Sequence, residues 1–477
     1  MNAELKVEKL FRIEKDLLGT REVAQQHYFG IQTLRAVENF QLSNAKVADY
    51  ANFIKALAMV KQACAVANFK LKQLDETQYQ AIVFACQEVI AGKYHDQFPV
   101  DMLQGGAGTS TNMNANEVIC NIALEYLGYD KGAYHILHPN NHVNMSQSTN
   151  DVYPTAIRLA VLLDLIPLKN HYKTLVAALR TKAVQFKDVM KMGRTQLQDA
   201  VPMTLGQEFN AFATTLEKDV RLLDQLLPDG LYYMNLGGTA IGTGINAPAH
   251  YTELSIQALA EISKMPIKSA PDLIEATSDM GDFVLLSGAL KRTATKLSKI
   301  ANDLRLLSSG PRAGLQEIQL EARQPGSSIM PGKVNPVIPE AVNISAFQVI
   351  GNDLAITFAA EAGQLQLNAM EPLIAFKLFE SIDLIGKAMQ MFEDKCIATI
   401  QANTVQCQNN VERSIGIVTA LNPYLGYETT TRIAKVAAET GRGVVELIRE
   451  EQLLSEEVLA KALSVESMVH QSVDVAV

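Results

Sequence analysis

A strict helical spacing of apolar residues over 203–227 constrains the fold of this chain more than any other feature. The apolar side chains recur at steps of three or four, the period of one face of an α-helix. The positions are Leu205, Phe209, Phe212, Leu216, Val220, Leu223 and Leu227. Segments 153–186 and 289–309 repeat the pattern, and Pro167 is a predicted kink. Strand-like alternation is sparse, so the sequence predicts a mostly α protein built on a bundle of long helices.

Helices this long and apolar need more cover than a single chain offers. The chain has 477 residues, 48% of them apolar, which gives room for two or three domains. A bundle shared between several chains is the natural solution, and a large monomeric α domain is the alternative. After about residue 400 the helical segments become shorter and more charged, which predicts a small separate domain.

Charge and composition argue against several classes of protein. The formal net charge is −9 and no basic run is present, so we expect no nucleic-acid partner, because phosphate recognition needs clustered Lys and Arg. No segment approaches the roughly 18 uninterrupted apolar residues of a membrane span, so no membrane partner is expected. The charged first residues lack the apolar core of a signal peptide.

The cysteines are odd in number and widely spaced, without a C-x-x-C pair. This pattern argues against a disulfide scaffold or a zinc site. It predicts small, buried, reduced thiols in a cytoplasmic protein. The five positions are Cys64, Cys86, Cys120, Cys396 and Cys407.

Two clusters of hydroxyl and amide side chains are candidate anion-binding sites. Each precedes a helical pattern, and hydroxyl and N–H groups at a helix N-terminus suit a carboxylate. Ordinary N-capping is the alternative. The first cluster, in QGGAGTSTNMNANE, holds Thr109, Ser110, Thr111 and Asn112. The second, in SQSTND, holds Ser146, Ser148, Thr149 and Asn150.

The segment GRTQLQD (193–199) places Arg194 beside Thr195 and Gln196. Arg194 could pair with a substrate carboxylate through two parallel hydrogen bonds, or it could form a structural ion pair, which we favour. Thr195 and Gln196 are neutral and can orient a substrate without adding charge.

Nucleotide and metal sites find little support. The segment NLGGTAIGTG (235–244) lacks the G-K-[ST] ending of a P-loop, and Ala247 stands where a dinucleotide fingerprint needs its third glycine. We therefore interpret it as a structural turn. Three histidines lie close in sequence, but without an H-E-x-x-H motif or a nearby Cys we favour solvated or capping roles. They are His135, His138 and His142.

The loop GSSIMPGKVN (326–335) combines two serines with Lys333 and Asn335. The lysine and the amide could hold a carboxylate, and a serine could act as a base if its pKa were lowered. Backbone N–H groups of a tight glycine loop and a nearby Lys would lower it, because both favour the oxyanion. No acyl-transfer triad is supported, since G-x-S-x-G is absent. The chemistry predicted is proton removal from a carbon next to a carboxylate.

The stretch GSSIMPGKVNP resembles the signature of the fumarase/aspartase superfamily, G-S-S-x-M-P-x-K-x-N-P. Other segments, such as RIEKDLLGTREV, VNMSQSTNDVYPT and GQLQLNAMEP, resemble its aspartate ammonia-lyases, from about residue 12 to beyond residue 440. The resemblance implies a mostly α subunit of three domains: N-terminal 1–146, central helical bundle 147–401 and small C-terminal 402–477. It also implies a homotetramer whose long helices form one twenty-helix core, with each active site drawn from three subunits.

By position, the resemblance implies a role for each candidate residue. Ser327 matches the general base, on a loop that closes over the substrate. The α-carboxylate ligands match Lys333 and Asn335, with Thr195 beside them. The β-carboxylate pocket matches Thr109, Ser148, Thr149 and Ser328. Asn150 matches a residue that contacts the amino group of the substrate, and Gln196 lies beside that contact. Glu340 matches an acidic residue that partners a histidine in fumarases.

That histidine is replaced by Gln196 in this chain, because fumarases typically read G-R-T-H where the chain reads G-R-T-Q. Hydration of fumarate needs a titratable group to handle water, whereas an amine leaves already protonated. We therefore expect an ammonia-lyase that converts L-aspartate reversibly to fumarate and ammonia through an enediolate. Fumarate hydratase is the alternative, and a non-catalytic structural protein on the same fold, such as a crystallin, is an alternative of another class. The resemblance implies no required cofactor and no metal site, with divalent cations as optional activators.

Overall fold

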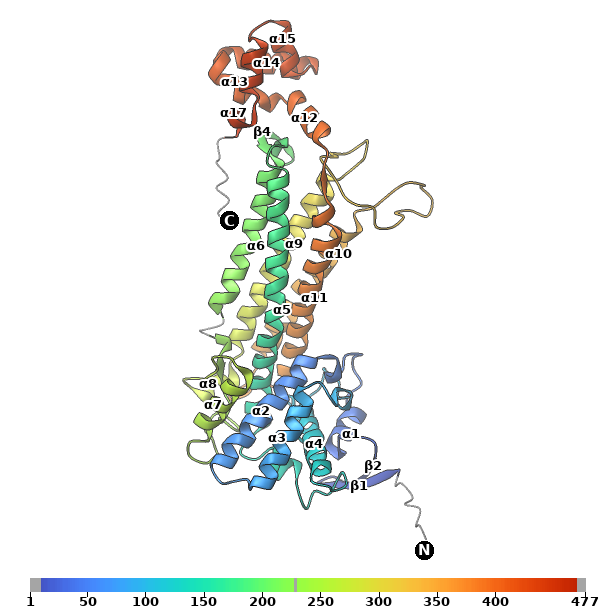
Figure 1. The fold of residues 1–477 in the computed structure, drawn as a ribbon, viewed down its shortest axis with the longest axis vertical. Coiled ribbons are helices and arrows are strands. Elements are labelled where there is room, and N and C mark those ends of the chain that lie inside the picture. Colours follow the sequence, from blue (N-terminus) through green and yellow to red (C-terminus); the bar gives the residue numbers. More distant parts are fainter. Residues whose placement is uncertain (1–9, 227–229, 470–477) are drawn as a thin grey trace. The chain divides into compact units, whose positions relative to one another are not determined.

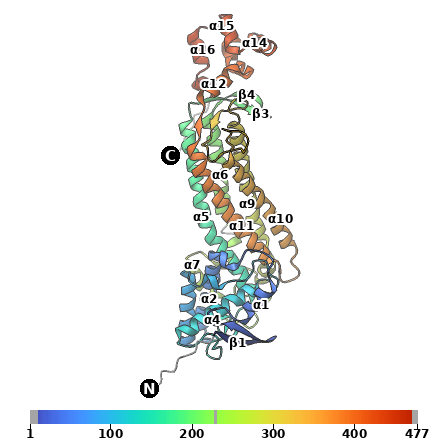
Figure 2. The ribbon, with the colours of Figure 1, turned by 90° about the vertical axis from the view of Figure 1, so that its right-hand side faces the viewer.

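The computed structural model describes residues 10–226 and 230–469, so Leu227 of the predicted stripe lies outside the described residues. Backbone contacts divide the chain into two compact units, and their boundaries fall inside long helices (Figures 1 and 2). The first unit comprises Met1–Leu168, Leu222–Lys291 and Gln348–Leu384. The second comprises Lys169–Arg221, Arg292–Phe347 and Ile385–Val477.

The first unit begins with an antiparallel hairpin followed by short and medium helices. The hairpin pairs Phe11 with Ala24 at its open end and Asp16 with Gly19 at its turn. Its strands and the helices that follow are β1 (Phe11–Asp16), β2 (Gly19–Ala24), α1 (Ile31–Asn39), α2 (Ala51–Lys70), α3 (Glu76–Ile90) and α4 (Thr109–Tyr126). Short 3-10 and π turns lie at Val47–Asp49, His95–Gln97 and Pro139–Val143.

Helix α2 forms the centre of the first unit. It packs against α3, α4 and α7 (Tyr251–Ser263), and its small residues, such as Ala56 and Ala63, are fully buried. Two polar side chains on this helix, Lys61 and Asn68, are also fully buried. The unit further contains β5 (Tyr233–Met234) parallel to β6 (Lys268–Ser269), α8 (Leu273–Ser278) and the beginning of α5 (Thr149–Gln185).

Long helices joined by polar contacts build the second unit. In α5, Arg180 bonds to Thr214 and Glu217 of α6, and Tyr172 bonds to Thr293 of α9. Asn343 of α10 donates to the Ser298 carbonyl of α9 at 3.0 Å. The helices besides α5 are α6 (Leu205–Leu226), α9 (Gly281–Leu307), α10 (Val337–Glu361) and α11 (Glu371–Lys395).

The C-terminal part of the second unit has its own apolar cluster, which includes Ile417, Leu421 and Ile433. Six short helices supply it: α12 (Thr404–Arg413), α13 (Val418–Leu425), α14 (Tyr427–Thr440), α15 (Val444–Glu450), α16 (Glu456–Ala462) and α17 (Val465–Met468). Two short turns lie at Ile397–Thr399 and Ile415–Ile417. The minor strands are β7 (Ile318–Gln319) and β8 (Gln401–Ala402), which pair antiparallel.

The three predicted long helices are confirmed as α5, α6 and α9, and α5 runs through both Pro154 and Pro167. Along α6 the predicted stripe is buried at five positions, and Val220 is half-buried. The buried positions are Leu205, Phe209, Phe212, Leu216 and Leu223. Two hairpins were not predicted: the β1–β2 hairpin, and the antiparallel hairpin of β3 (Met190–Thr195) and β4 (Gln198–Thr204), in which segment 193–199 lies.

An apolar stripe on α10 is left uncovered by the chain itself. Its spacing of three and four residues places the side chains on one helical face. Phe347 is 61% exposed and Phe358 is 65% exposed, and the stripe is completed by Ile344, Ile350 and Leu354. Contiguous apolar surface of this kind is typical of an interface between chains.

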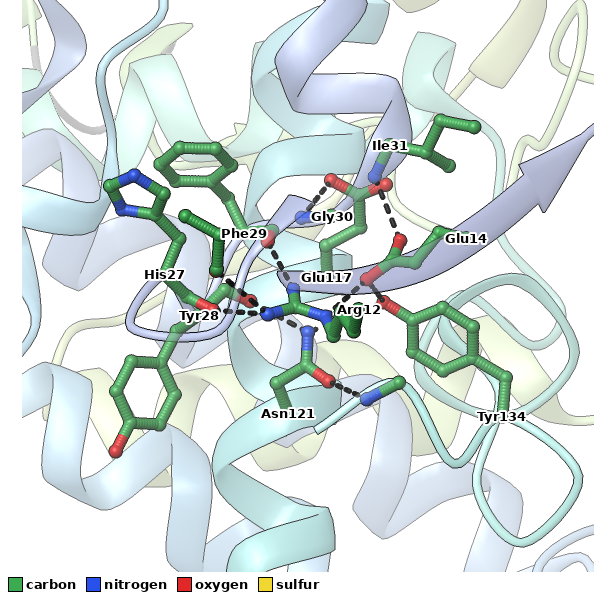
Figure 3. Close-up of polar contacts among 12 residues, drawn as sticks. Arg12, Glu14, His27, Tyr28, Phe29, Gly30, Ile31, Glu117, Asn121 and Tyr134 are labelled. Atoms are coloured by element: carbon green, nitrogen blue, oxygen red, sulfur yellow. Dashed lines mark hydrogen bonds and ion pairs between the residues drawn. The ribbon is translucent and has the colours of Figure 1, made fainter. Parts of the chain in front are cut away.

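Arg12 connects the first hairpin to the loop that precedes α1 (Figure 3). Its Nε donates to Glu14 Oε1 at 2.7 Å, and its two terminal nitrogens donate to the carbonyls of His27 at 2.8 Å and Phe29 at 2.6 Å. Arg12 and Glu14 are both buried. A buried guanidinium with these partners holds the loop in one conformation.

Glu117 of α4 caps the start of α1 (Figure 3). Its carboxylate accepts hydrogen bonds from the backbone N–H groups of Gly30, Gln32 and Thr33 at 2.8, 2.8 and 3.1 Å, and from the Thr33 hydroxyl at 2.6 Å. The first N–H groups of a helix have no partner within the helix, so this carboxylate satisfies donors that would otherwise be buried and unpaired. Helix α1 is thereby fixed to α4, the helix that begins at Thr109.

We expect Glu117→Ala to lower the free energy of unfolding by about 3 kcal/mol or more, because four donors, three of them buried, lose their acceptor. Glu125→Ala on the same helix is the matched control. Glu125 is 41% exposed, and both its ion pair with Lys131 at 3.4 Å and its hydrogen bond from the Tyr28 hydroxyl at 2.5 Å lie at the surface, so its loss should cost about 1 kcal/mol or less. The measurement is the thermal unfolding midpoint by circular dichroism; equal midpoints for the two variants would contradict the capping role.

Candidate active site

The first hydroxyl cluster divides into structural and available residues. Thr111 is buried, and its N–H and hydroxyl both donate to the Gln104 side chain, at 3.1 and 3.0 Å. Asn112 is also buried. Thr109, in contrast, is exposed at the first position of α4, after Gly108, whose φ of 85° lies in the left-handed region. The Thr109 hydroxyl donates to the Gly106 carbonyl at 2.8 Å, and Ser110, at the second position, is half-buried, so these two predicted residues are presented at a helix N-terminus.

The second cluster lies at the start of α5 and is fixed by Asp151. This fully buried carboxylate accepts the Ser148 N–H at 2.9 Å, and the N–H groups of Gly237 and Thr239 at 2.9 and 3.2 Å. Burial raises the pKa of Asp151 to about 6, against the lowering effect of these three donors. The segment 235–244 is thus confirmed as a structural turn, held beside Ser148 and Thr149.

Asn150 is oriented by the same turn. Its Nδ2 donates to the Ala240 carbonyl at 2.7 Å, and its own carbonyl accepts the Asn235 amide at 2.9 Å. Because the amide nitrogen faces Ala240, the side-chain oxygen of Asn150 is directed away from that carbonyl as an acceptor. Thr149 accepts a hydrogen bond from Asn112 at 3.1 Å.

In the second unit, Thr195 and Gln196 lie at the tip of the β3–β4 hairpin. Thr195 pairs with Gln198, which leaves Gln196 and Leu197 as a two-residue turn with φ of 53° and 61°. Such turns favour glycine at these angles, and a side chain held there stores on the order of 1 kcal/mol of strain. Both Thr195 and Gln196 are exposed at this strained tip.

Glu317 anchors the base of this hairpin. Its buried carboxylate lies 2.7 Å from Arg194 Nη1 and 2.9 Å from Lys191 Nζ, and it accepts the Asn410 amide at 3.1 Å. Lys191 also contacts Glu208 at 2.6 Å. The structural ion pair predicted for Arg194 is confirmed, and its partner, Glu317, is the part that sequence reasoning missed.

The loop 326–335 arranges backbone donors around Ser327. The Ser327 hydroxyl oxygen accepts the Met330 N–H at 2.9 Å and the Ile329 N–H at 3.2 Å. These donors favour the ionised oxygen, as the sequence analysis expected of a tight glycine loop. The base of the loop is closed by Gly326, whose N–H donates to the Lys333 carbonyl at 2.8 Å and whose carbonyl accepts the Asn335 amide at 2.8 Å.

A side chain at position 326 would not fit. A Cβ on Gly326 would lie 2.7 Å from the Lys333 carbonyl oxygen and 2.8 Å from the Asn335 nitrogen. Ser328 and Lys333 are exposed on the loop, and Ser327 is half-buried. Glu340, in the first turn of α10, lies 3.9 Å from Arg305 and is also half-buried.

The predicted site residues fall into two groups, one in each compact unit. Neither unit contains both groups. The first unit holds Thr109, Ser148, Thr149 and Asn150. The second holds Thr195, Gln196, Ser327, Ser328, Lys333, Asn335 and Glu340.

Two of the three histidines, His138 and His142, act as caps, and His135 is exposed. His138 Nδ1 accepts the N–H groups of Asn140 and Asn141 at 3.1 and 3.3 Å, and His142 Nδ1 accepts the His138 N–H at 2.8 Å. The described ranges contain no group of three or more His, Cys, Asp or Glu side chains placed to hold a metal ion. All five cysteines are free and buried, as predicted. Of the helices that the structure describes, none is long and apolar enough to span a membrane.

Comparisons with known proteins place these features in a family. A sequence profile of the family described as "Lyase" matches residues 19–351, and one described as "Fumarase C C-terminus" matches residues 417–470. The chain is 65% identical to the aspartate ammonia-lyase of Pseudomonas aeruginosa over 458 residues, which covers 96% of this chain and 97% of that protein. It is 54% identical to that of Escherichia coli K12, covering 96% of each.

The chain belongs to the aspartate ammonia-lyase family. Solved structures agree with this assignment. The fumarate lyase:delta crystallin of Brucella melitensis bound to cobalt matches with a TM-score of 0.93 at 54% identity, covering 96% of this chain and 99% of that chain. The class II fumarase of Schistosoma mansoni matches with a TM-score of 0.90 at 34% identity, over the same shares. The predicted fold of the fumarase/aspartase superfamily is therefore confirmed.

Two residues that support the candidate site were missed from the sequence: Asp151 and Glu317. Both are buried carboxylates whose partners lie far away along the chain. The spacing of Asp151 three residues after Ser148 does carry a signal, because a carboxylate at that distance can accept an N–H at a helix start. Glu317 has no comparable local signal.

We expect Glu317→Ala to destabilise the second unit by about 3–5 kcal/mol, because it removes the buried carboxylate that contacts the buried Lys191 and the partly buried Arg194. The control is Glu321→Ala: Glu321 pairs with Arg323 at 2.8 Å but is 49% exposed, and its loss should cost less than about 1 kcal/mol. Urea unfolding followed by tyrosine fluorescence measures both. If the two variants unfold at the same urea concentration, Glu317 does not anchor the hairpin.

Proposed function

We propose that this protein is an aspartate ammonia-lyase, a carbon–nitrogen lyase that converts L-aspartate reversibly to fumarate and ammonia. Curated relatives with this name are 54–65% identical to nearly the whole chain. The observation that carries the mechanism is the Ser327 loop, in which two backbone N–H groups converge on one serine oxygen. This arrangement suits a base that must ionise before it can remove a carbon-bound proton.

The proposed reaction has two steps. Ionised Ser327 takes a proton from Cβ of aspartate, and the electron pair of the broken C–H bond moves into the β-carboxylate to give an enediolate dianion. The dianion then collapses to the double bond of fumarate, and the C–N bond breaks with its electron pair leaving on nitrogen. Because the amine is protonated when it departs, no separate acid is required. Fixed donors around the dianion are the largest catalytic contribution in such a site.

The two carboxylates of aspartate receive separate ligands in this proposal. Lys333 and Asn335 of the loop bind the α-carboxylate, with Thr195 of the hairpin. The amino group of the substrate faces the side-chain oxygen of Asn150. This oxygen can accept from an ammonium group, because the side-chain nitrogen of Asn150 already donates to the Ala240 carbonyl. The β-carboxylate ligands are Thr109, Ser148, Thr149 and Ser328.

Fumarate hydratase is the second candidate, because a class II fumarase matches at 34% identity. Gln196 argues against it. The amide cannot titrate, so it cannot activate water with Glu340 as a histidine would. A structural role on the same fold is disfavoured because both Ser327 and Lys333 are retained.

We further propose that the protein is a homotetramer of three-domain subunits, with domains 1–146, 147–401 and 402–477 and a shared twenty-helix core. The uncovered apolar stripe on α10, with Phe347 and Phe358 more than half exposed, supports burial against a second copy. The division of the site residues between the two units supports a site completed by another subunit.

The proposed reaction needs only a side-chain base, so the proposal includes no required cofactor; divalent cations enter it only as activators. The proposed partners are L-aspartate, fumarate and ammonium. A cytoplasmic location is proposed from the five free thiols, which suit a reducing compartment.

The function is tested by following the ultraviolet absorbance of fumarate with aspartate, malate or argininosuccinate as the substrate of the purified protein. We expect fumarate from aspartate alone. Faster formation of fumarate from malate than from aspartate would replace the proposal with fumarase.

Ser327→Ala should lower kcat for aspartate by about 10²- to 10⁴-fold, because it removes the base. The hydrogen bonds of this half-buried hydroxyl, within the part of the chain that the structure describes, stay inside its own loop, so the oligomer and its thermal stability should be unchanged. Ser308→Ala, which removes a hydroxyl bonded to the Arg305 carbonyl, is the control and should retain full activity. A Ser327→Ala enzyme that keeps more than about a tenth of kcat would exclude Ser327 as the base.

Thr149→Ala and Ser327→Ala chains, each with only a low residual kcat alone, should regain activity when they are unfolded and refolded together. If the two residues of one site come from different subunits, about one quarter of the sites in mixed tetramers contain both native residues. The measurement is the activity of the mixture against each variant refolded alone. Mixed oligomers, verified by mass spectrometry, that stay inactive would show that each site belongs to one chain.

A further inference from the structure

Lys61 is a fully buried cation in the middle of α2, and it lies outside every role assigned above. Its Nζ donates to the side-chain oxygens of Asn112 at 2.7 Å, Asn144 at 3.0 Å and Gln147 at 2.8 Å. Its three N–H donors are thus all used. Asn112 comes from α4, whereas Asn144 and Gln147 come from the segment just before α5.

The three acceptors are neutral amides, and no carboxylate within residues 10–226 and 230–469 forms an ion pair with Lys61. The buried Asp151 acts on Lys61 only through space, because its oxygens are bonded to the N–H groups of Ser148, Gly237 and Thr239. Burial lowers the pKa of Lys61 to about 8, which leaves it mostly charged at neutral pH. An ammonium ion without a contacting counter-ion is costly to bury, and its field is correspondingly strong.

The amides around Lys61 are oriented so that this field reaches Thr149. Asn112 directs its oxygen to Lys61 and donates from its nitrogen to the Thr149 hydroxyl oxygen at 3.1 Å. The Thr149 oxygen therefore accepts, and its own hydrogen is left to donate to another group. Donors linked in this way polarise one another, so a positive charge at one end strengthens the donor at the other.

We propose that Lys61 is a positioning residue of the β-carboxylate subsite, which it polarises through Asn112 and Thr149. This inference rests on the proposed function. When the Cβ proton leaves, the β-carboxylate changes from one negative charge to two. A buried cation two hydrogen bonds away stabilises the second charge in addition to the first, so it lowers the barrier more than it tightens substrate binding.

Lys61→Met is the first test, because Met has similar length and no charge. We expect kcat for aspartate to fall about 10- to 100-fold while KM changes less than about threefold. The matched control is Asn68→Ala. Asn68 is fully buried on the same helix and holds the same pre-α5 segment through the Met145 carbonyl and the Ser146 hydroxyl, at 2.9 Å each. A purely structural Lys61 would predict the same kinetic change in both variants.

Asn112→Asp is the second test, and it does not depend on the Met variant folding. Asp has the size of Asn and gives Lys61 an ionic partner, so the positive charge is cancelled within the network. A carboxylate also has no N–H to donate to Thr149, so the variant breaks the link between Lys61 and Thr149 as well. We expect the same fall in kcat. If either folded variant keeps kcat within about threefold of wild type, the proposal is wrong.

A double-mutant comparison tests the route. In a Thr149→Val background the hydroxyl is gone, so adding Lys61→Met should change kcat by less than about threefold. If Lys61→Met lowers kcat in the Thr149→Val background as much as it does in wild type, Lys61 does not act through Thr149.

A binding experiment separates this inference from the proposed function, because it needs no turnover. The probes are succinate and 3-nitropropionate, whose planar nitronate form has the geometry of the enediolate. Calorimetric titration should show that wild type prefers the nitronate and that Lys61→Met loses that preference by about 10-fold, while Asn68→Ala keeps it. Wild-type protein that fails to deaminate aspartate but shows this pattern would refute the function and retain the subsite. If Lys61→Met loses the same factor in affinity for succinate as for the nitronate, the role of Lys61 is wrong.

Discussion

The contacts of Asp151 determine most of the geometry at the start of α5. One buried carboxylate holds the N–H of Ser148 and two N–H groups of the turn at Gly237 and Thr239. These segments are distant in sequence, and neither has a partner of its own for those donors. Glu117 and Glu317 repeat the device at α1 and at the β3–β4 hairpin. In each case a buried acceptor joins segments that are distant in sequence, and at Asp151 the predicted residues Ser148 and Thr149 lie at the joint.

This use of buried carboxylates explains how an enzyme made of long helices can hold polar loops rigidly. A loop cannot satisfy all its backbone donors internally, and water is absent where it meets the core. A carboxylate accepts several donors at once, so a single side chain can fix a whole turn. Lys61 is the cationic counterpart: one ammonium group orients three amides, and through them the hydroxyl of Thr149.

The long helices could be predicted from the sequence because their signal is local. The three- and four-residue spacing along α6 depends only on which face is buried, and five of its predicted positions are buried. The β3–β4 hairpin could not be predicted, because Gln196 and Leu197 at its turn lack the Asn-Gly signature and are held there by distant contacts. The loop of Ser327 was identified from its content of Gly, Ser and Pro. A tight loop of this composition was expected to turn backbone N–H groups toward a serine, as the N–H groups of Ile329 and Met330 do. The partner of Arg194 depends on tertiary contact alone, so no pattern in the sequence could identify Glu317.

The loop from Gly326 to Asn335 has a consequence for the entropy of substrate capture. Ser327 and the N–H groups that favour its ionised form belong to one short segment, and the Gly326–Lys333 and Asn335–Gly326 bonds close that segment at its neck. In the proposed reaction, the base is therefore assembled before any ligand arrives and moves with the segment as one body. Only the orientation of that body remains to be fixed when the substrate binds, so the disorder lost on closure is that of a hinge and not that of a whole flexible chain.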